Sequence, residues 1–545
     1  MPGPSRNRPD LRLRLVENKA ETLSIAIRRR GEVFLKMSRA SNNRCRFCND
    51  AAFQDGTFWP FEAMAAMIDE GLARGVRRVF LSGGEPTIHP DFLKVVAYAR
   101  RRGAEHVTCI TNGRLFAYPE LCDKAVRLGL TEAFVAVLGS DAATHDDLSQ
   151  VAGSFAQTTE GVRNLVARGV RVHLSTVVNR KNLHQLADIL GLVPGVTGLT
   201  AVRIAPAGRA LWEALDELGF ETEEARPHVE RAFRRAAELG LDFVPKLFPA
   251  SFYEGREASY THHEEYLPEI KDTELRTGLF GTYARGAGEV ACRGETCRVC
   301  FRRPYCDALY AFREALLAHG HAVVRCDLDD PRQCALLPAL HRERRLWLRV
   351  RRADTVEARL AELGLAVEPW IVEADELGAG DAPACEHLLL CADATVGRAE
   401  RLGRARRVGL VPVAGAEPDA ALAAVASFVS VATHERYRDE LARGLAAPRG
   451  ATDRGLPVFG LPPCLAPQSV APAEADDVLD LVAVATPTTL DVVGFTHFFL
   501  AHLDRDRSAR CASCSEADGC PGLHVNHARR WGFGVLAPLG EPAER

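Results

Sequence analysis

Nine of the sixteen cysteines in this chain gather in three groups whose spacing suits metal binding. The groups are Cys45 and Cys48; Cys292, Cys297, Cys300 and Cys306; and Cys511, Cys514 and Cys520. In a reducing compartment, close Cys-x-x-Cys groups bind metals or serve redox chemistry more often than they form disulfides. The cysteines therefore predict metal or iron–sulfur sites.

The first group lies in a polar loop that follows an apolar segment, Val33–Met37. Two residues separate Cys45 from Cys48, and one of them is Phe47. Two thiolates at this spacing can hold one metal ion or one edge of a cluster. Half of a zinc site, or two buried thiols, would have the same spacing.

A second polar segment, LSGGEPTIHP at residues 81–90, follows the next apolar run. Gly83 and Gly84 allow another part of the backbone to approach closely. Glu85, which precedes Pro86, presents a carboxylate at the carboxyl end of a strand, where functional groups gather in α/β folds. A simple turn would also explain these residues.

Short β-branched runs alternate with amphipathic segments between residues 60 and 250, which predicts alternating strands and helices. Such units form a parallel sheet with right-handed crossovers, either open or closed into a whole or partial barrel. In both architectures, function lies at the carboxyl ends of the strands. Strands are expected at 77–81, 106–111, 133–138, 170–178, 199–205 and 241–244.

The alternation is interrupted at residues 246–310 and then resumes as far as residue 461. The pattern Cys-x2-Cys-x5-Cys also occurs twice, at 297–306 and 511–520, each about 50 residues after a Pro-containing strand end. A duplication would produce this repeated pattern. Two independent sites on unrelated domains are the alternative. Further strands are expected at 346–350, 366–373, 387–391, 407–413, 428–432 and 458–461.

The composition is that of a globular protein without a membrane or nucleic-acid role. Lys and Arg total 68 against 72 Asp and Glu, so no overall positive charge attracts phosphates. The longest apolar stretch, around residues 420–432, is shorter than the ~20 residues that cross a bilayer. The N-terminal MPGPSRNRPDLRLRL lacks the apolar core of a secretory signal. A cytoplasmic location is therefore expected.

The pair Cys45 and Cys48, followed about 35 residues later by Gly83-Gly84-Glu85, resembles the radical S-adenosylmethionine (radical SAM) superfamily. The loops of that family read Cys-x3-Cys-x2-Cys and Gly-Gly-Glu. Residues 145–170 are also similar to a helix-leading stretch in bacterial members, and the resemblance covers residues 30 to about 245. Further strand ends resemble the family at 110–113, 140–141, 175–180 and 202–210.

This resemblance implies a partial (β/α)6 barrel that binds a four-iron four-sulfur cluster and SAM. Three cysteines hold three irons, SAM chelates the fourth, and reduction cleaves SAM to methionine and a 5′-deoxyadenosyl radical. It implies Cys45 and Cys48 as cluster ligands, and it identifies no catalytic side chain. It implies cofactor contacts for Phe47, Gly83, Gly84, Glu85, Pro86, Asn112, Ser140, Ser175 and Asn179.

The chain departs from the family pattern at the first cysteine, which falls on Ser41. A serine hydroxyl is a harder ligand than a thiol, and it is far less acidic than a thiol, whose pKa is about 8.5. It therefore binds iron only if the metal displaces its proton. Four explanations stay open: alkoxide ligation by Ser41, a cluster on two thiolates and a foreign ligand, loss of radical chemistry with retention of the fold, and a serine that is not natural.

The two downstream cysteine groups resemble the auxiliary iron–sulfur extension called SPASM or twitch, which follows many radical SAM barrels that modify peptides and proteins. The next cysteine of that pattern is absent, because Tyr310 and His524 stand at its positions. In this interpretation Cys292 completes the first site, and His524 or Cys464 completes the second. Structural zinc would use the same ligands.

The sequence thus predicts an α/β protein: a partial barrel with a Cys-rich extension, then a second α/β domain with its own Cys-rich end, which would be a degenerate repeat if the chain arose by duplication. Its parts are expected at 1–29, 30–245, 246–315, 316–465 and 466–545. The resemblance implies hydrogen-atom abstraction from an unreactive C–H bond of a peptide or protein. The implied cofactors are a 4Fe–4S cluster, SAM and one or two auxiliary clusters, with flavodoxin or ferredoxin as electron donor. The alternative is a catalytically inactive binding or partner protein with structural zinc.

Overall fold

The computed structural model describes residues 27–28, 32–48, 54–204, 217–260, most of 308–411, 420–430, 458–459, 462, 464–465 and most of 478–540. They fall into two compact units: the first extends to residue 248, and the second comprises residues 249–260 and those from 308 onward. Cys292, Cys297, Cys300 and Cys306 lie outside the described residues. The predicted five-part division stays a prediction.

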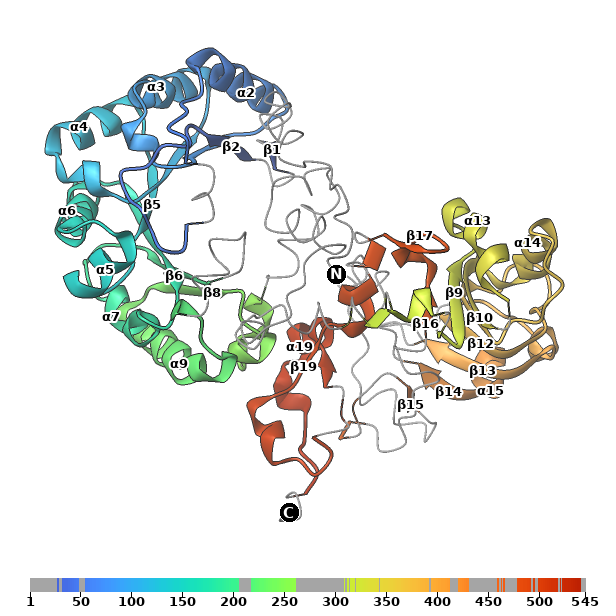
Figure 1. Cartoon of the computed structure of the whole chain (residues 1–545). Coiled ribbons are helices and arrows are strands. Elements are labelled where there is room, and N and C mark those ends of the chain that lie inside the picture. The colour runs from blue at the N-terminus through green and yellow to red at the C-terminus, as the bar shows by residue number, and fades with distance from the viewer. Residues whose placement is uncertain are drawn as a thin grey trace, which may run out of the picture. The chain divides into compact units, whose positions relative to one another are not determined.

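The first unit is a curved sheet whose strands follow one another in chain order, with helices along its outer side (Figure 1). Seven strands, β2 to β8, are parallel, one more than the resemblance implied, and β1 pairs antiparallel with β2. The strands are β1 (Ile27–Arg28), β2 (Glu32–Lys36), β3 (Arg78–Ser82), β4 (His106–Thr111), β5 (Glu132–Ala136), β6 (Arg171–Val178), β7 (Gly198–Arg203) and β8 (Asp242–Lys246). The helices are α2 (Phe61–Ala73), α3 (Phe92–Arg102), α4 (Pro119–Leu128), α5 (Ala142–Ser149), α6 (Ser154–Ala167), α7 (Leu186–Leu190) and α9 (Thr222–Leu239).

Alternation along these strands divides the sheet into two different faces. The face toward the helices is apolar, and its members are fully buried, among them Val79, Val107, Val135, Val172 and Leu199. The opposite face carries a row of rings. Phe34 and Phe80 lie 6.1 Å apart between centroids, Phe80 and Phe134 6.3 Å, and Phe134 and His173 5.2 Å. The apolar face fixes the strand register, so the strand ends come to a common edge.

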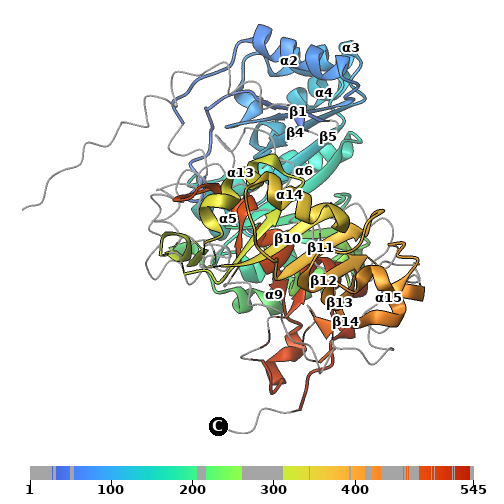
Figure 2. The same cartoon turned by 90° about the vertical axis from the view of Figure 1, so that its right-hand side faces the viewer.

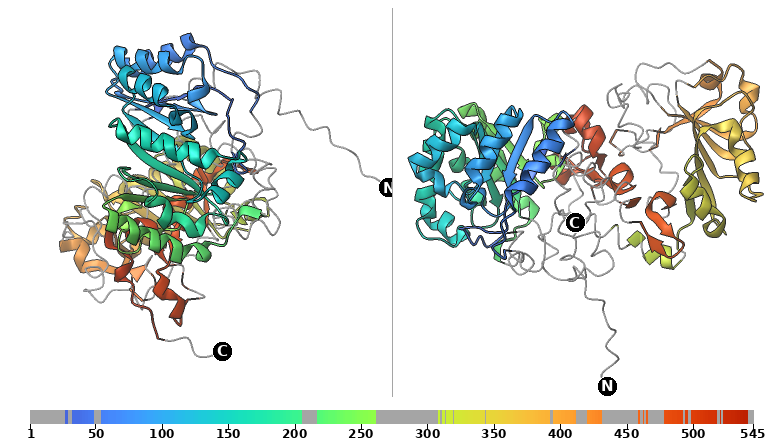
Figure 3. Two further views of the ribbon diagram at one scale, coloured as in Figure 1. Left: turned by 90° about the vertical axis from the view of Figure 1, so that its left-hand side faces the viewer. Right: turned by 90° about the horizontal axis from the view of Figure 1, so that it is seen from above.

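The second unit is also built on a parallel sheet, in which β9 to β15 again lie in chain order and β16 pairs with the free side of β9. Helices α13, α14 and α15 lie beside this sheet (Figures 2 and 3). The strands are β9 (Val323–Asp327), β10 (Arg345–Arg352), β11 (Ile371–Glu376), β12 (Cys385–Cys391), β13 (Ala405–Val411), β14 (Ala426–Ser430), β15 (Val458–Phe459) and β16 (Val478–Asp480), with short pairs β17 (Val484–Thr486) and β18 (Thr489–Leu490), and β19 (Arg505–Asp506) and β20 (Leu523–His524). The helices are α13 (Pro331–Leu340), α14 (Val356–Glu362), α15 (Ala420–Val425) and α19 (Val525–Trp531).

These two sheets confirm the α/β class. All twelve strands expected within residues 77–461 are present, β4 with the expected ends and the others with shifted ends, whereas β1, β9 and β16 to β20 were not predicted. None of the helices in the described part of the chain has the length and hydropathy that a bilayer crossing requires. The repeat relation between the units stays a prediction, although both contain seven parallel strands in chain order.

A buried ion-pair network fills part of the second sheet. Arg325 on β9 pairs with Asp480 on β16 at 2.8 Å and with Glu373 on β11 at 3.4 Å. Only residues 328–330 connect β9 to α13. The long loop that carries Cys45 and Cys48 after β2 therefore has no counterpart after β9.

Candidate functional site

Two loops meet at the carboxyl ends of β2 and β3: the cysteine loop (residues 37–48) and the glycine loop (residues 83–86). Both Gly83 and Gly84 have positive φ, at 81° and 50°. A Cβ at Gly83 would lie 2.9 Å from Lys36 Cα, and one at Gly84 would collide with the Ala40 carbonyl. Glu85 N donates to that same carbonyl at 2.7 Å. The close backbone approach expected from the glycines is present, and the cysteine loop is its partner.

The Glu85 carboxylate ties the ends of β3 and β4 together. It is 1% exposed, and burial raises its pKa while its hydrogen-bond donors oppose that shift. Oε1 accepts from Thr87 N, Thr87 Oγ1 and Thr111 Oγ1 at 3.0, 2.6 and 2.7 Å, and Oε2 accepts from Asn112 N at 2.7 Å. A carboxylate offers about four acceptor sites. Most of this group is therefore engaged by the protein itself, and its predicted contact with SAM stays a prediction.

The end of β4 holds the cysteine loop from a second side. Asn112 Nδ2 donates to Asn42 Oδ1 at 2.6 Å. The Arg114 guanidinium donates to Asn42 O and, at 3.0 Å, to Asn43 Oδ1. Arg114 is itself positioned by Gln157 on α6, whose Oε1 accepts from Arg114 Nε at 2.7 Å.

The two thiols of this loop are partly buried, and Phe47 between them is buried. Cys48 N donates to Cys45 O at 3.1 Å, and Gln54 Nε2 donates to Cys48 Sγ at 3.4 Å. Burial, reinforced by the neighbouring Cys48, raises the pKa of Cys45 to about 12. A bound metal cation would reverse this preference, because it coordinates the thiolate directly. These soft donors fit an iron–sulfur cluster, but they supply two thiolates and not three.

Ser41, at the position of the missing thiolate, is engaged in a local turn. Its Oγ accepts from Asn43 N at 3.1 Å. Ser and Thr hydroxyls commonly cap turns in this way. The serine therefore has a role in the loop that requires no metal.

The remaining predicted cofactor residues lie on neighbouring strand ends. Pro86 is buried in the turn after Glu85, and Ser175 lies on β6. Ser140 N donates to Gln185 Oε1 at 2.8 Å. Asn179 is fully buried, and its side-chain amide bonds to Val177 O and Lys181 N within its own turn. Contacts of these residues with a nucleoside stay predictions.

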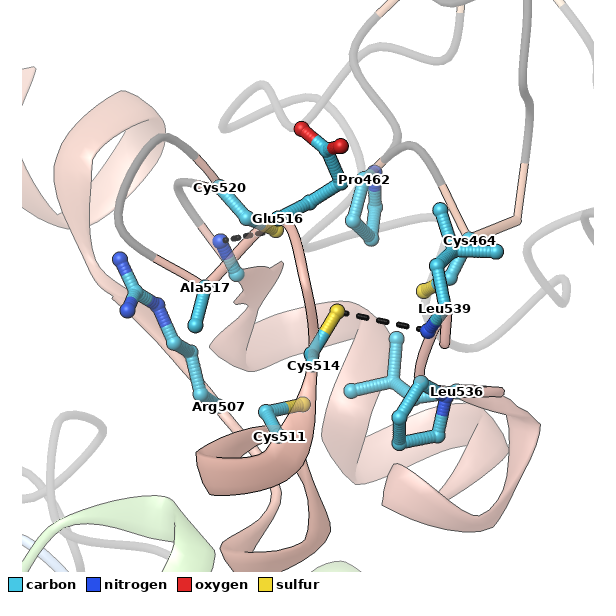
Figure 4. Close-up of a pocket in the computed structure, with 12 residues that line it drawn as sticks. Pro462, Cys464, Arg507, Cys511, Cys514, Glu516, Ala517, Cys520, Leu536 and Leu539 are labelled. Atoms are coloured by element: carbon cyan, nitrogen blue, oxygen red, sulfur yellow. Dashed lines mark hydrogen bonds between the residues drawn. The ribbon is translucent and has the colours of Figure 1, made fainter. Parts of the chain in front are cut away.

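A second candidate site is a pocket in the second unit, where four cysteines from two segments come together. Cys514 Sγ accepts from Leu539 N, and Cys520 Sγ accepts from Gly522 N, each at 3.4 Å. Burial raises the pKa values of Cys464 and Cys511. The lining residues are Pro462, Cys464, Arg507, Cys511, Cys514, Glu516, Ala517, Cys520, Gly522, Leu536, Pro538 and Leu539 (Figure 4).

His524, the other ligand considered for this site, is not among the lining residues and lies buried on β20. Across the described residues, no three His, Cys, Asp or Glu side chains are arranged to hold a single metal ion. A single zinc ion needs all of its ligands around one point, whereas a cluster spreads its thiolates over several irons.

Comparison with known proteins places the first candidate site in a family. The model of the radical SAM superfamily matches residues 35–193, which include the cysteine loop and the glycine loop. These residues form a radical SAM domain. Enzymes of this superfamily use a four-iron four-sulfur cluster and SAM.

Several curated proteins resemble the radical SAM domain. The AdoMet-dependent heme synthase of Nitratidesulfovibrio vulgaris is 31% identical over 32% of this chain and 48% of its own length. The mycofactocin maturase MftC of Mycobacterium ulcerans is 37% identical over 27% of this chain and 41% of its own. The PqqA peptide cyclase of Ruegeria pomeroyi is 26% identical over 38% and 57%. The chain thus spans about half the length of these relatives.

Sequence reasoning missed the residues that anchor the cysteine loop of the radical SAM domain to α5. Arg46 pairs with Asp147 at 2.8 Å and with Glu217 at 3.0 Å, and Lys181 bridges the same two carboxylates at 2.8 Å. These residues are up to 171 positions apart in the chain. The only local clue was the basic residue between the two cysteines.

We expect His145 on α5 to make the stability of this domain depend on pH. The ring is 1% exposed, its Nδ1 accepts from Leu138 N at 3.2 Å, and burial lowers its pKa from 6.5 to about 4. Below pH 6.5 the unfolded chain binds a proton that the folded chain excludes, so stability is complete above 6.5 and is lost as the pH falls toward 4. In His145→Gln, the stability lost between pH 7 and pH 4.5 should be smaller by about 2–3 kcal/mol. Urea denaturation at both pH values measures this, and equal losses in the two proteins would contradict it.

A second prediction concerns the fourth ligand of the cysteine pocket. Cys464→Ala should weaken metal retention against a chelator by at least roughly tenfold, since even indirect partners of a metal ligand contribute that much. His524→Asn should retain the metal, because His524 does not line the pocket. Cys391→Ala, on β12, is the matched control. Metal analysis after dialysis decides, and loss of metal in His524→Asn with retention in Cys464→Ala would reverse the assignment.

Proposed function

We propose that this chain is a radical SAM enzyme that abstracts a hydrogen atom from an unreactive C–H bond of a peptide or protein. The observation that carries the proposal is the contact between the cysteine loop and the glycine loop at one edge of the parallel sheet. Function in parallel α/β folds lies at this edge. The radical SAM family match covers both loops.

The residues of the site have separable tasks in this proposal. Cys45 and Cys48 would hold the cluster, which when bound supplies the electron that cleaves SAM. Gly83 and Gly84 leave room for the loops to approach, and Glu85 ties the ends of β3 and β4 together. Among the described residues, Asn112 N is the one donor to Glu85 Oε2. The row of rings on the inner face of the sheet would present apolar surface to the substrate. A dry, apolar surrounding protects a reactive radical from side reactions.

The substrate class rests on the relatives and on the second cysteine site. One relative is named a peptide cyclase, and others are heme synthases. The cysteine pocket of the second unit has the spacing of the auxiliary sites found in peptide-modifying members. Its N–H donors to Cys514 and Cys520 suit cluster sulfurs, whose charge such hydrogen bonds stabilise. An auxiliary cluster there would accept the electron released when product forms, and a flavodoxin or ferredoxin would supply the first electron.

A second candidate function follows from Ser41. With two thiolates, the radical SAM domain would bind SAM or a partner without producing a radical, and the cysteine pocket would hold structural zinc. The specific observation in favour of this candidate is that the Ser41 hydroxyl accepts a hydrogen bond from Asn43 N, a role in the loop that uses no iron.

The deciding experiment compares wild type with Ser41→Cys under anaerobic conditions. Iron, sulfide and zinc are measured first, and electron paramagnetic resonance spectra are then recorded with and without SAM. Because an auxiliary cluster contributes iron by itself, the SAM-induced spectral change is the informative quantity. We expect wild type to show this change and to form 5′-deoxyadenosine.

The other outcomes separate the candidates. If only Ser41→Cys shows the change, the fold is competent and the natural chain belongs to the second candidate. If neither protein shows it and both contain zinc, radical chemistry is excluded for this chain.

A further inference from the structure

The cysteine loop makes backbone hydrogen bonds to the end of α5. Arg44 N donates to Ser149 O at 3.0 Å, and Arg46 N donates to Leu148 O at 3.1 Å. The last carbonyls of a helix have no partner within the helix, so an external donor there satisfies a group that is otherwise left open. These hydrogen bonds thus satisfy both the amides of the loop and the last carbonyls of the helix, and they involve no metal.

The Arg46 side chain adds a charged anchor at the same place. Its Nη2 lies 2.8 Å from Asp147 Oδ1, and its Nε donates to Asp147 O at 3.2 Å. Lys181 and Glu217 extend the pair to a network of four charges. The side chains of Arg46 and Asp147 are about one-third exposed, at 31% and 34%. Networks with several charges and defined geometry contribute more than isolated surface pairs.

The start of the loop is fixed independently. Ser41 Oγ accepts from Asn43 N, and the Asn43 side chain in turn accepts from Arg114. Ala40 O accepts from Glu85 N. Both ends of the Ser41–Cys48 segment are therefore held by protein groups.

We propose that Ser41 serves this loop as a turn cap and not as an iron ligand, and that Arg46, Asp147 and the end of α5 position the loop in place of the missing third thiolate. The part of this inference that concerns a cluster rests on the proposed function. The conformation of the metal-free loop can be measured whether or not the proposed function is correct. The inference predicts that the loop keeps its conformation when no metal is bound.

The two roles of Ser41 predict opposite behaviour for one variant. Asparagine can cap the same turn through its side-chain oxygen, but it cannot become an anionic oxygen ligand. If Ser41 is a cap, Ser41→Asn resembles wild type and Ser41→Ala does not. If Ser41 is an alkoxide ligand, both variants lose the cluster in the loop.

The first test uses hydrogen exchange of the full chain after removal of metal, with the amides of Asn43, Arg44 and Arg46 resolved by fragmentation mass spectrometry. All three should be protected in wild type. Ser41→Ala should accelerate exchange at Asn43 about tenfold, while Ser41→Asn stays within about twofold of wild type, because it retains the cap. Asp147→Asn should accelerate exchange at Arg44 and Arg46 about threefold, the size expected for an ion pair that is partly exposed.

Asp123→Asn is the matched control for the charged anchor. Asp123 pairs with Arg168 at 2.7 Å and makes no contact with the loop, so the same substitution there should leave the loop amides unchanged. Exchange across α6 verifies that each variant is folded. Unprotected loop amides in metal-free wild type, or equal exchange in Ser41→Ala and Ser41→Asn, would overturn the proposal.

The second test is the SAM-induced change in the electron paramagnetic resonance spectrum, which reports the loop cluster and not the auxiliary one. Ser41→Asn should retain at least about half of the wild-type change. Its loss in Ser41→Asn would identify Ser41 as a ligand. If wild type itself shows no change, the proposed function fails, and the exchange experiment alone decides whether Ser41 is a cap.

Discussion

At the carboxyl ends of β2 and β3, the cysteine loop passes so close to Gly84 that no side chain fits between them. This approach requires a left-handed backbone at two consecutive residues, which glycine adopts without strain. It also places the Ala40 carbonyl where Glu85 N can donate to it. The position of Cys45 and Cys48 relative to the sheet follows from this contact. A substitution at Gly84 would therefore displace the thiols before it affected any cofactor directly.

Buried polar groups extend this constraint to the neighbouring strands. Glu85 is inaccessible to water, so its carboxylate must be satisfied by protein donors. Thr87, Thr111 and Asn112 provide them, and Asn112 also bonds to the cysteine loop through Asn42. One chain of hydrogen bonds thus joins the ends of β3 and β4 to the loop. These hydrogen bonds hold the site together where a cofactor would need its ligands fixed in advance.

Much of the fold could be predicted from the sequence, because alternation of apolar residues reports directly on strands such as β4 and β6. β16 was missed since a three-residue strand carries too little periodicity. The two loops were recognised from local motifs, whereas the Arg46–Asp147 pair and the approach of Cys464 to the other pocket cysteines join residues distant in the chain. Contacts between residues that are distant in the chain produce no periodic pattern in the sequence. Sequence spacing did not decide between His524 and Cys464 as the remaining ligand of the second cysteine site. In the structure, Cys464 lines the pocket and His524 does not.

The second unit shows that this fold does not depend on the loop. Its strands follow the same chain order, yet β9 runs into α13 with no room for a cysteine loop, and Arg325 pairs with buried carboxylates on the sheet. The stability of a parallel sheet comes from the apolar residues that it buries against its helices, while the loops at the carboxyl ends carry function. A change at Ser41 therefore bears on the conformation of the cysteine loop and hardly at all on the fold of the sheet. For the same reason, an intact sheet in the first unit is no evidence that the radical chemistry is retained, and the spectrum with SAM has to provide that evidence.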